Sequence, residues 1–128
     1  MITRTALGWQ TGNWKIQLSQ AITSVEKLLS MLELSPDLLP AGLQAAESFK
    51  LRVPMPYAAK IEKGNHNDPL LRQILPVEEE LNIAPGFTHD PLGEQDANAL
   101  PGILHKYKSR ILLISGSACA INCRYCFR

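Results

Sequence analysis

The chain has 128 residues, 45% of them hydrophobic and 20% charged, which suffices for one globular domain with a modest core. Its formal net charge of +1 gives no electrostatic reason to expect nucleic acid or an anionic membrane as a partner. No apolar run approaches the roughly 20 residues that cross a bilayer. Residues 1–12 lack the apolar segment of a secretory signal, so we expect a cytoplasmic protein.

A helical region is predicted at the start of the chain. Its first helix carries an amphipathic stripe with the spacing i, i+4, i+7 and i+8, made of Trp14, Leu18, Ala21 and Ile22. Thr23, with Glu26 three residues later, predicts a capping box at the start of a second helix. The buried face of that second helix is expected to be Val25, Leu28, Leu29 and Leu32.

Prolines divide the next part of the chain. Ser35 and Pro36 predict an N-cap followed by proline in the first helical turn. A further helix is expected over residues 41–50. Pro54 and Pro56 then predict an extended elbow, because each proline disfavours helical backbone at the residue before it.

Two short helices are expected after this elbow. One spans about residues 57–63 and ends at Gly64, a residue suited to a left-handed cap. The other begins at Asp68 and Pro69. Its buried apolar residues are expected to be Leu70, Leu71, Ile74 and Leu75.

A long irregular stretch, residues 82–102, separates the helices from the next regular segment. Loops of this length in compact domains are commonly functional or packed on another surface. Three apolar residues are expected to anchor it: Phe87, Leu92 and Leu100. Regularity returns over Arg110–Ser115, an apolar and branched run that is typical of a buried strand in a parallel sheet.

All three cysteines lie within eight residues, as Cys119, Cys123 and Cys126. A clustered, odd set is a poor disulfide framework and indicates a reducing compartment or a bound metal. The C-x3-C-x2-C spacing offers three thiolates to a [4Fe–4S] cluster and leaves the fourth iron open. If S-adenosylmethionine (SAM) chelates that iron, one electron from the cluster cleaves a carbon–sulfur bond and yields a 5′-deoxyadenosyl radical.

Half of a zinc site is the alternative interpretation. Zinc takes four ligands, commonly from two C-x2-C pairs or from paired histidines. The sequence has no second pair of this kind, and His105 is the nearest further candidate. The cysteines also follow a predicted strand directly, where parallel sheets place their active-site loops. The pattern therefore favours the cluster, and a small helical interaction module with a C-terminal zinc knuckle is the alternative.

The segments around the cysteines resemble the lysine 2,3-aminomutase family. This resemblance is carried by His105-Lys106-Tyr107, by residues 110–114, and by residues 119–128. Further segments resemble one branch of the family, the elongation factor P (R)-β-lysylation proteins: residues 51–54, 63–65, 68–73, 84–87 and 90–92. The similarity is good over residues 48–128 and loose before them.

The resemblance implies an α/β fold, in which an N-terminal helical region leads into the first strand of a radical-SAM β/α barrel. Residues 1–100 would form the mainly helical region with its long loop. Residues 101–128 would start the barrel with its first strand and the cluster loop. A barrel needs several more strands, so we expect an N-terminal part of a longer protein that is inactive on its own.

The activity that the resemblance implies is a radical-SAM isomerase reaction that also uses pyridoxal 5′-phosphate (PLP). It converts L-α-lysine to (R)-β-lysine by moving the amino group from the α- to the β-carbon. In the resembled branch, β-lysine is attached to elongation factor P, so this factor and its ligase are the expected pathway partners. A free-lysine 2,3-aminomutase is the alternative activity.

Three residues match the family's cluster ligands: Cys119, Cys123 and Cys126. Arg110, Tyr107 and Lys106 match the segment that holds the PLP phosphate in that family, where a guanidinium fork suits a phosphate dianion. Lys106 departs from the arginine that is more common at this position in free-lysine aminomutases.

Two further arginines flank the cysteines. Arg128 matches the arginine that binds the substrate carboxylate in the resembled family. Arg124 is expected to tune the field at the cluster or to pack on Tyr125. The family's remaining catalytic residues, including its PLP-anchoring lysine, are expected beyond residue 128.

Overall fold

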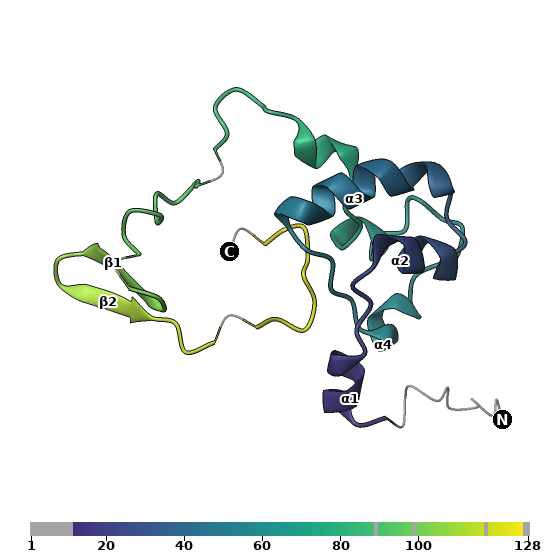
Figure 1. The fold of residues 1–128 in the computed structure, drawn as a ribbon, viewed down its shortest axis with the longest axis horizontal. Helices are drawn as coiled ribbons and strands as arrows, with labels where there is room; N and C mark the ends of the chain where they lie inside the picture. Colours follow the sequence, from purple (N-terminus) through teal and green to yellow (C-terminus); the bar gives the residue numbers. More distant parts are fainter. Residues whose placement is uncertain (1–11, 89, 99, 117, 127–128) are drawn as a thin grey trace. The chain divides into compact units, whose positions relative to one another are not determined.

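The computed structural model describes residues 12–88, 90–98, 100–116 and 118–126 (Figure 1). These residues divide into two compact units, which we call the helical unit (residues 12–82 and 120–126) and the hairpin unit (residues 83–119). The domain boundary predicted at residue 100 stays a prediction. The α-helices are α1 (Trp14–Ser19), α2 (Val25–Met31), α3 (Leu39–Ser48) and α4 (Met55–Ala58). The 3₁₀ helices are η1 (Pro36–Leu38), η2 (Leu71–Gln73) and η3 (Glu78–Leu81).

Helix α2 begins one residue later than a cap at Thr23 requires. Ser24 is the N-cap, and its hydroxyl accepts a hydrogen bond from the Lys27 N–H at 3.2 Å. The predicted capping box is therefore wrong, because the helix starts at Val25 and leaves Thr23 outside it. The predicted buried face is confirmed: Val25, Leu28, Leu29 and Leu32 are all at most 3% exposed.

The proline-rich segments follow the predictions only in part. The extended elbow is confirmed at Pro54 and wrong at Pro56, because Met55 and Pro56 both lie inside a helix. Ser35 caps η1 by accepting from the Asp37 N–H, as expected for a serine before proline. Helix α3 starts at Leu39 and accommodates Pro40 in its first turn, where a missing N–H costs nothing. Helix α4 is shorter than expected and starts earlier, at Met55, with Pro54 as its extended N-cap.

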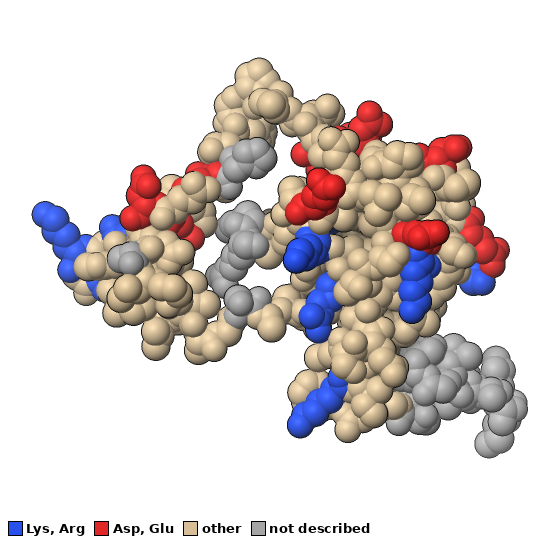
Figure 2. Space-filling model, in the orientation of Figure 1, with Lys and Arg blue, Asp and Glu red and all other residues tan. Residues whose placement is uncertain are grey.

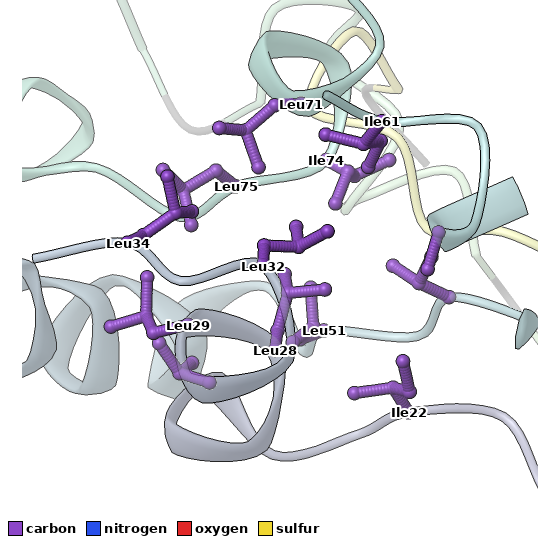
Figure 3. Close-up of a cluster of buried hydrophobic side chains, with 13 residues drawn as sticks. Ile22, Leu28, Leu29, Leu32, Leu34, Leu51, Ile61, Leu71, Ile74 and Leu75 are labelled. Carbon is purple, nitrogen blue, oxygen red and sulfur yellow. The ribbon is translucent and has the colours of Figure 1, made fainter. Parts of the chain in front are cut away.

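The core of the helical unit joins α2 to the segments before and after α4. Figure 3 shows the side chains of α2 pointing toward Leu71, Ile74 and Leu75, each of which is at most 7% exposed. Ile22 and Val53 form an isolated antiparallel bridge, with N–H···O distances of 2.7 and 2.9 Å in the two directions. The remaining core members are Leu34, Leu51, Ala58 and Ile61.

Asp68 organises the turn that leads into this core. Its carboxylate accepts hydrogen bonds from the N–H groups of Leu70, Leu71 and Glu62, at 2.8, 3.0 and 3.1 Å. These bonds, led by those from Glu62 and Leu71, lower the pKa of Asp68 although its burial opposes the shift. The helix start predicted at Asp68 is wrong, because η2 spans Leu71–Gln73 with Leu70 as its N-cap, and Asp68 closes the turn before it.

The hairpin unit contains β1 (Ile103–Tyr107) and β2 (Arg110–Leu113), which pair antiparallel (Figure 1). Ile103 pairs with Leu113 and Tyr107 with Arg110, with an irregularity between Leu104 and Tyr107. The strand predicted over Arg110–Ser115 therefore exists, but it is exposed along its length and lies in a hairpin. A two-residue connection makes β1 the nearest partner at little entropic cost. The β/α barrel stays a prediction.

The irregular stretch before the hairpin is confirmed as non-helical beyond η3. The prediction that three apolar side chains anchor this stretch is wrong, since Phe87, Leu92 and Leu100 are 84%, 42% and 61% exposed. Asp90 holds a turn there by accepting from the Glu94 and Gln95 N–H groups, both at 2.9 Å. Among the residues described, no helix has the length and apolar character that a membrane span requires.

Candidate metal centre

The cysteine loop is divided between the two units. Cys119 is the last residue of the hairpin unit, whereas Cys123 and Cys126 belong to the helical unit. All three are free thiols; Cys123 is half-buried, and the other two are exposed. In the described part of the chain, no three His, Cys, Asp or Glu residues gather into a set that could hold a metal ion.

Cys123 and Cys126 lie at the two ends of one turn. The Cys126 N–H donates to the Cys123 carbonyl oxygen at 3.0 Å, which closes a four-residue turn around Arg124 and Tyr125. The closed turn brings the backbones of the two cysteines close together. The donor chemistry therefore fits an iron–sulfur cluster, because thiolates are the ligands that such clusters use and two of the three already share a turn.

The residues before Cys123 attach the loop to the helical unit. Ile121 packs against the hydrophobic core. Asn122 donates its N–H to the Arg52 carbonyl oxygen at 3.0 Å, and its side-chain amide donates to the Lys50 carbonyl oxygen at 2.9 Å. The backbone just before Cys123 is thereby fixed to the segment that follows α3.

Arg124, directly after Cys123, makes the most extensive contacts in the loop. Its N–H donates to the Gln73 carbonyl oxygen at 2.7 Å. Its Nε donates to Glu80 Oε1 at 2.8 Å, and its Nη1 donates to the Phe49 carbonyl oxygen at 2.7 Å. The guanidinium carbon lies 5.0 Å from the centre of the Phe49 ring, within cation–π range.

The Arg124 side chain is only 9% exposed, and its ion pair with Glu80 is therefore partly desolvated. The prediction that Arg124 packs on Tyr125 is wrong, since Tyr125 is 89% exposed and the guanidinium faces Phe49 instead. Figure 2 shows acidic and basic side chains interspersed over the helical unit on the face drawn.

Tyr57 is a neighbour of the loop that the sequence pattern missed. Its hydroxyl donates to the Leu70 carbonyl oxygen at 3.1 Å. Burial raises the pKa of Tyr57, and the negative charges of Asp68 and Cys123 add to the shift. Tyr57 and Cys123 lie far apart in the sequence, so no local motif links them.

The predicted phosphate-binding residues all lie on the hairpin. Tyr107 and Arg110 pair across the strands, with the guanidinium carbon 4.5 Å from the centre of the tyrosine ring. Lys106 Nζ donates to the Leu92 carbonyl oxygen, and its charge contributes to the lowered pKa of Asp90, after the Gln95 and Glu94 N–H groups. Among the described residues no carboxylate pairs with Arg110, so its charge is available to an anion. Arg128 lies outside the described residues.

Comparison with known proteins finds relatives that match most of this chain. It is 48% identical over 117 residues to an Escherichia coli (strain K12) protein and 47% identical over 116 residues to a Haemophilus influenzae protein. A Clostridium subterminale protein is 31% identical over 116 residues. All three relatives are named L-lysine 2,3-aminomutase, and each match covers 91% of the chain. No family model matches the chain.

The chain spans about a third of the length of the curated relatives it matches. It covers 34% of the Escherichia coli and Haemophilus influenzae proteins and 28% of the Clostridium subterminale protein. These matches confirm the resemblance to the lysine 2,3-aminomutase family and are consistent with an N-terminal part of such a protein.

Proposed function

We propose that the protein carrying this chain is a radical-SAM, PLP-dependent isomerase that converts L-α-lysine to (R)-β-lysine for attachment to elongation factor P. One observation carries the proposal: a C-x3-C-x2-C sequence in a chain that matches proteins named L-lysine 2,3-aminomutase over 91% of its length. The turn that joins Cys123 to Cys126 supports it, because two residues with soft sulfur donors share one closed turn.

In this proposal Cys119, Cys123 and Cys126 hold a [4Fe–4S] cluster with one open iron for SAM. A cluster held there would supply one electron for cleavage of a carbon–sulfur bond of SAM, with methionine and a 5′-deoxyadenosyl radical as the products. The chain has to hold the three thiolates at fixed positions relative to one another. The contacts of Asn122 and Arg124 on both sides of Cys123 perform that task for one of the ligands.

The hairpin is the proposed site for the PLP phosphate. Arg110 offers a guanidinium that no described carboxylate neutralises, and its central carbon lies 4.5 Å from the centre of the Tyr107 ring. A fixed guanidinium fork binds a phosphate dianion through two parallel hydrogen bonds. Lys106 adds a point charge, without the fork geometry of arginine. We propose that Arg128 binds the carboxylate of the lysine substrate. The proposed location of the protein is the cytoplasm.

Anaerobic reconstitution with iron and sulfide tests the cluster. We expect the complete protein that carries this chain to become brown and to bind up to about four irons per chain. After reduction it should give an electron paramagnetic resonance signal typical of [4Fe–4S]⁺. Cys123→Ser should lose the cluster, whereas Ser30→Ala, on the surface of α2, should load like the wild type. A colourless protein that binds zinc instead would favour the zinc knuckle and overturn the proposal.

A second experiment separates the proposed pathway from the free-lysine alternative. The loaded enzyme is supplied with SAM, PLP and L-lysine, and β-lysine is measured with and without elongation factor P and its ligase. We expect β-lysine that is transferred to the factor. Efficient turnover of free lysine whose product is never attached to the factor would favour a free-lysine 2,3-aminomutase.

A further inference from the structure

The loop that carries Cys123 and Cys126 is attached to the helical unit through residues that are not cluster ligands. Asn122 binds the backbone of the segment after α3, and Arg124 binds Gln73, Glu80 and Phe49. Neither contact involves a thiol, so both leave the sulfur atoms available to a metal. The helical unit therefore determines where the turn between the two cysteines lies.

We infer that Arg124 is a positioning residue that locks the Cys123–Cys126 turn onto the helical unit and sets the positive field at the cluster. The inference deepens the proposed function and rests on it, because it assigns a role at the proposed cluster to a residue outside the ligand set.

The chemistry of the contacts requires arginine. Nε and Nη1 reach acceptors on two different segments, the Glu80 carboxylate and the Phe49 carbonyl group, while the guanidinium plane faces the Phe49 ring. A lysine has a single nitrogen at the end of a flexible stem and cannot serve both acceptors with fixed geometry. The contacts therefore restrain both the position and the orientation of the side chain.

Among the described residues, the carboxylate that pairs with Arg124 is that of Glu80. Glu80 Oε1 accepts from both Arg124 Nε and the Val77 N–H, and the Glu80 side chain is more exposed than that of Arg124, at 26% against 9%. The remaining nitrogen, Arg124 Nη2, is buried and has no hydrogen-bond partner among the described residues. Arg124 directly follows Cys123 in the chain. A nearby positive charge favours the reduced state of an iron–sulfur cluster.

Two substitutions in the complete protein separate the attachment of the Cys123–Cys126 turn from the electrostatic effect of the Arg124 charge. Arg124→Gln removes the charge and the ion pair, so we expect the cluster to be lost to a chelator about tenfold faster, as for other residues that support metal ligands. Its midpoint potential should fall. Glu80→Gln keeps the arginine charge and removes its compensation, so the cluster should again be lost faster while its midpoint potential rises.

Opposite shifts of the potential distinguish this role from a purely structural one, which would weaken both variants without such a sign difference. Arg124→Lys should restore the potential but not the full resistance to chelator, because it restores only the charge. The matched controls are Arg72→Gln, an exposed arginine of η2, and Glu33→Gln, whose ion pair with Lys63 is exposed. Both should behave like the wild type.

Hydrogen exchange of residues 120–126 in the metal-free protein adds a readout that does not depend on the cluster. We expect faster exchange there in Arg124→Gln and unchanged exchange in α2. A wild-type protein that loads no cluster would overturn the proposed function. A loaded wild type with an equally retained cluster and an unchanged potential in Arg124→Gln would overturn this inference alone. If Arg124→Gln fails to fold, an unchanged potential in Glu80→Gln overturns it.

Discussion

The two units use apolar residues in opposite ways. In the helical unit, the apolar residues of α2 and of the segment after Asp68 are buried against one another. In the hairpin unit, β2 and its continuation present four consecutive apolar residues, Ile111 to Ile114, that are all at least 40% exposed. An apolar run thus becomes core only where several segments converge on it, and a two-stranded hairpin offers one neighbour per strand.

The cysteines follow the same division. The turn from Cys123 to Cys126 is attached to the unit that has a core, whereas Cys119 belongs to the hairpin unit. We therefore expect the positions of Cys123 and Cys126, the second and third proposed ligands, to depend on the stability of the helical unit.

The largest expected effect is a cavity in the helical unit. Leu28 is 0% exposed, so Leu28→Ala should lower the free energy of unfolding by about 2–5 kcal/mol. Leu112 is 53% exposed, and Leu112→Ala is the same chemical change in the hairpin, where we expect less than about 0.5 kcal/mol. Denaturant unfolding followed by circular dichroism at 222 nm measures both. Equal losses would mean that the hairpin is as well buried as the core and would break the comparison.

A close approach of two helices gives the second effect. A Cβ atom on Gly42 of α3 would lie 2.9 Å from Val25 Cγ1 of α2, and the branched valine has little freedom to move away. Gly42→Ala should therefore destabilise by about 1–3 kcal/mol, although alanine is the better helix former. In the hairpin unit, a Cβ on Gly116 meets nothing within 4 Å, and Gly116→Ala is the control. A more stable Gly42→Ala chain would show that α2 and α3 can separate at little cost.

Local patterns predicted the parts of this molecule that depend on nearby residues. The buried face of α2 follows from its helical spacing, and the Cys123–Cys126 turn lies within a motif whose spacing is itself the signal. Arg124 is different, because its acceptors Glu80 and Phe49 lie 44 and 75 residues earlier in the chain. Nothing near Arg124 in the sequence distinguishes these partners from the adjacent Tyr125.

The hairpin shows a second limit of local patterns. The apolar run that starts at Arg110 predicted a buried strand, since such runs are usually covered on both faces. Burial depends on the number of segments that pack on a strand, which composition does not contain. The capping box at Thr23 failed for a smaller reason: two adjacent hydroxyl residues both satisfy the composition of an N-cap, and only the start of the helix at Val25 selects Ser24.

Acid sensitivity should also differ between the units. The lowered pKa of Asp68 means that its contribution to stability is present above the unfolded value of about 3.9 and is lost as the pH falls through the folded value. Asp68→Asn should therefore lower the unfolding midpoint at pH 7 and make stability depend less on pH in the acid range. Thermal unfolding measured from pH 7 down to pH 3 gives both quantities.

Asp90 provides the control in the hairpin unit, because its pKa is also lowered, mainly by backbone N–H groups. Its turn is not part of the core, so Asp90→Asn should change local exchange around residues 93–95 and leave global unfolding nearly unchanged. A loss of acid sensitivity in Asp90→Asn as large as that in Asp68→Asn would show that the two units unfold together.

The smallest expected effect concerns the start of α2. Ser24→Ala removes the hydroxyl that accepts from the Lys27 N–H, so it should cost about 1 kcal/mol of stability. Thr23→Ala should cost much less, because Thr23 lies outside the helix and is exposed. The two variants remove one hydroxyl each from neighbouring positions. Any difference between their unfolding midpoints therefore measures the N-cap hydrogen bond of Ser24 and not the loss of a hydroxyl as such. If Thr23→Ala were the more damaging change, the helix would begin one residue earlier, as the sequence pattern predicts.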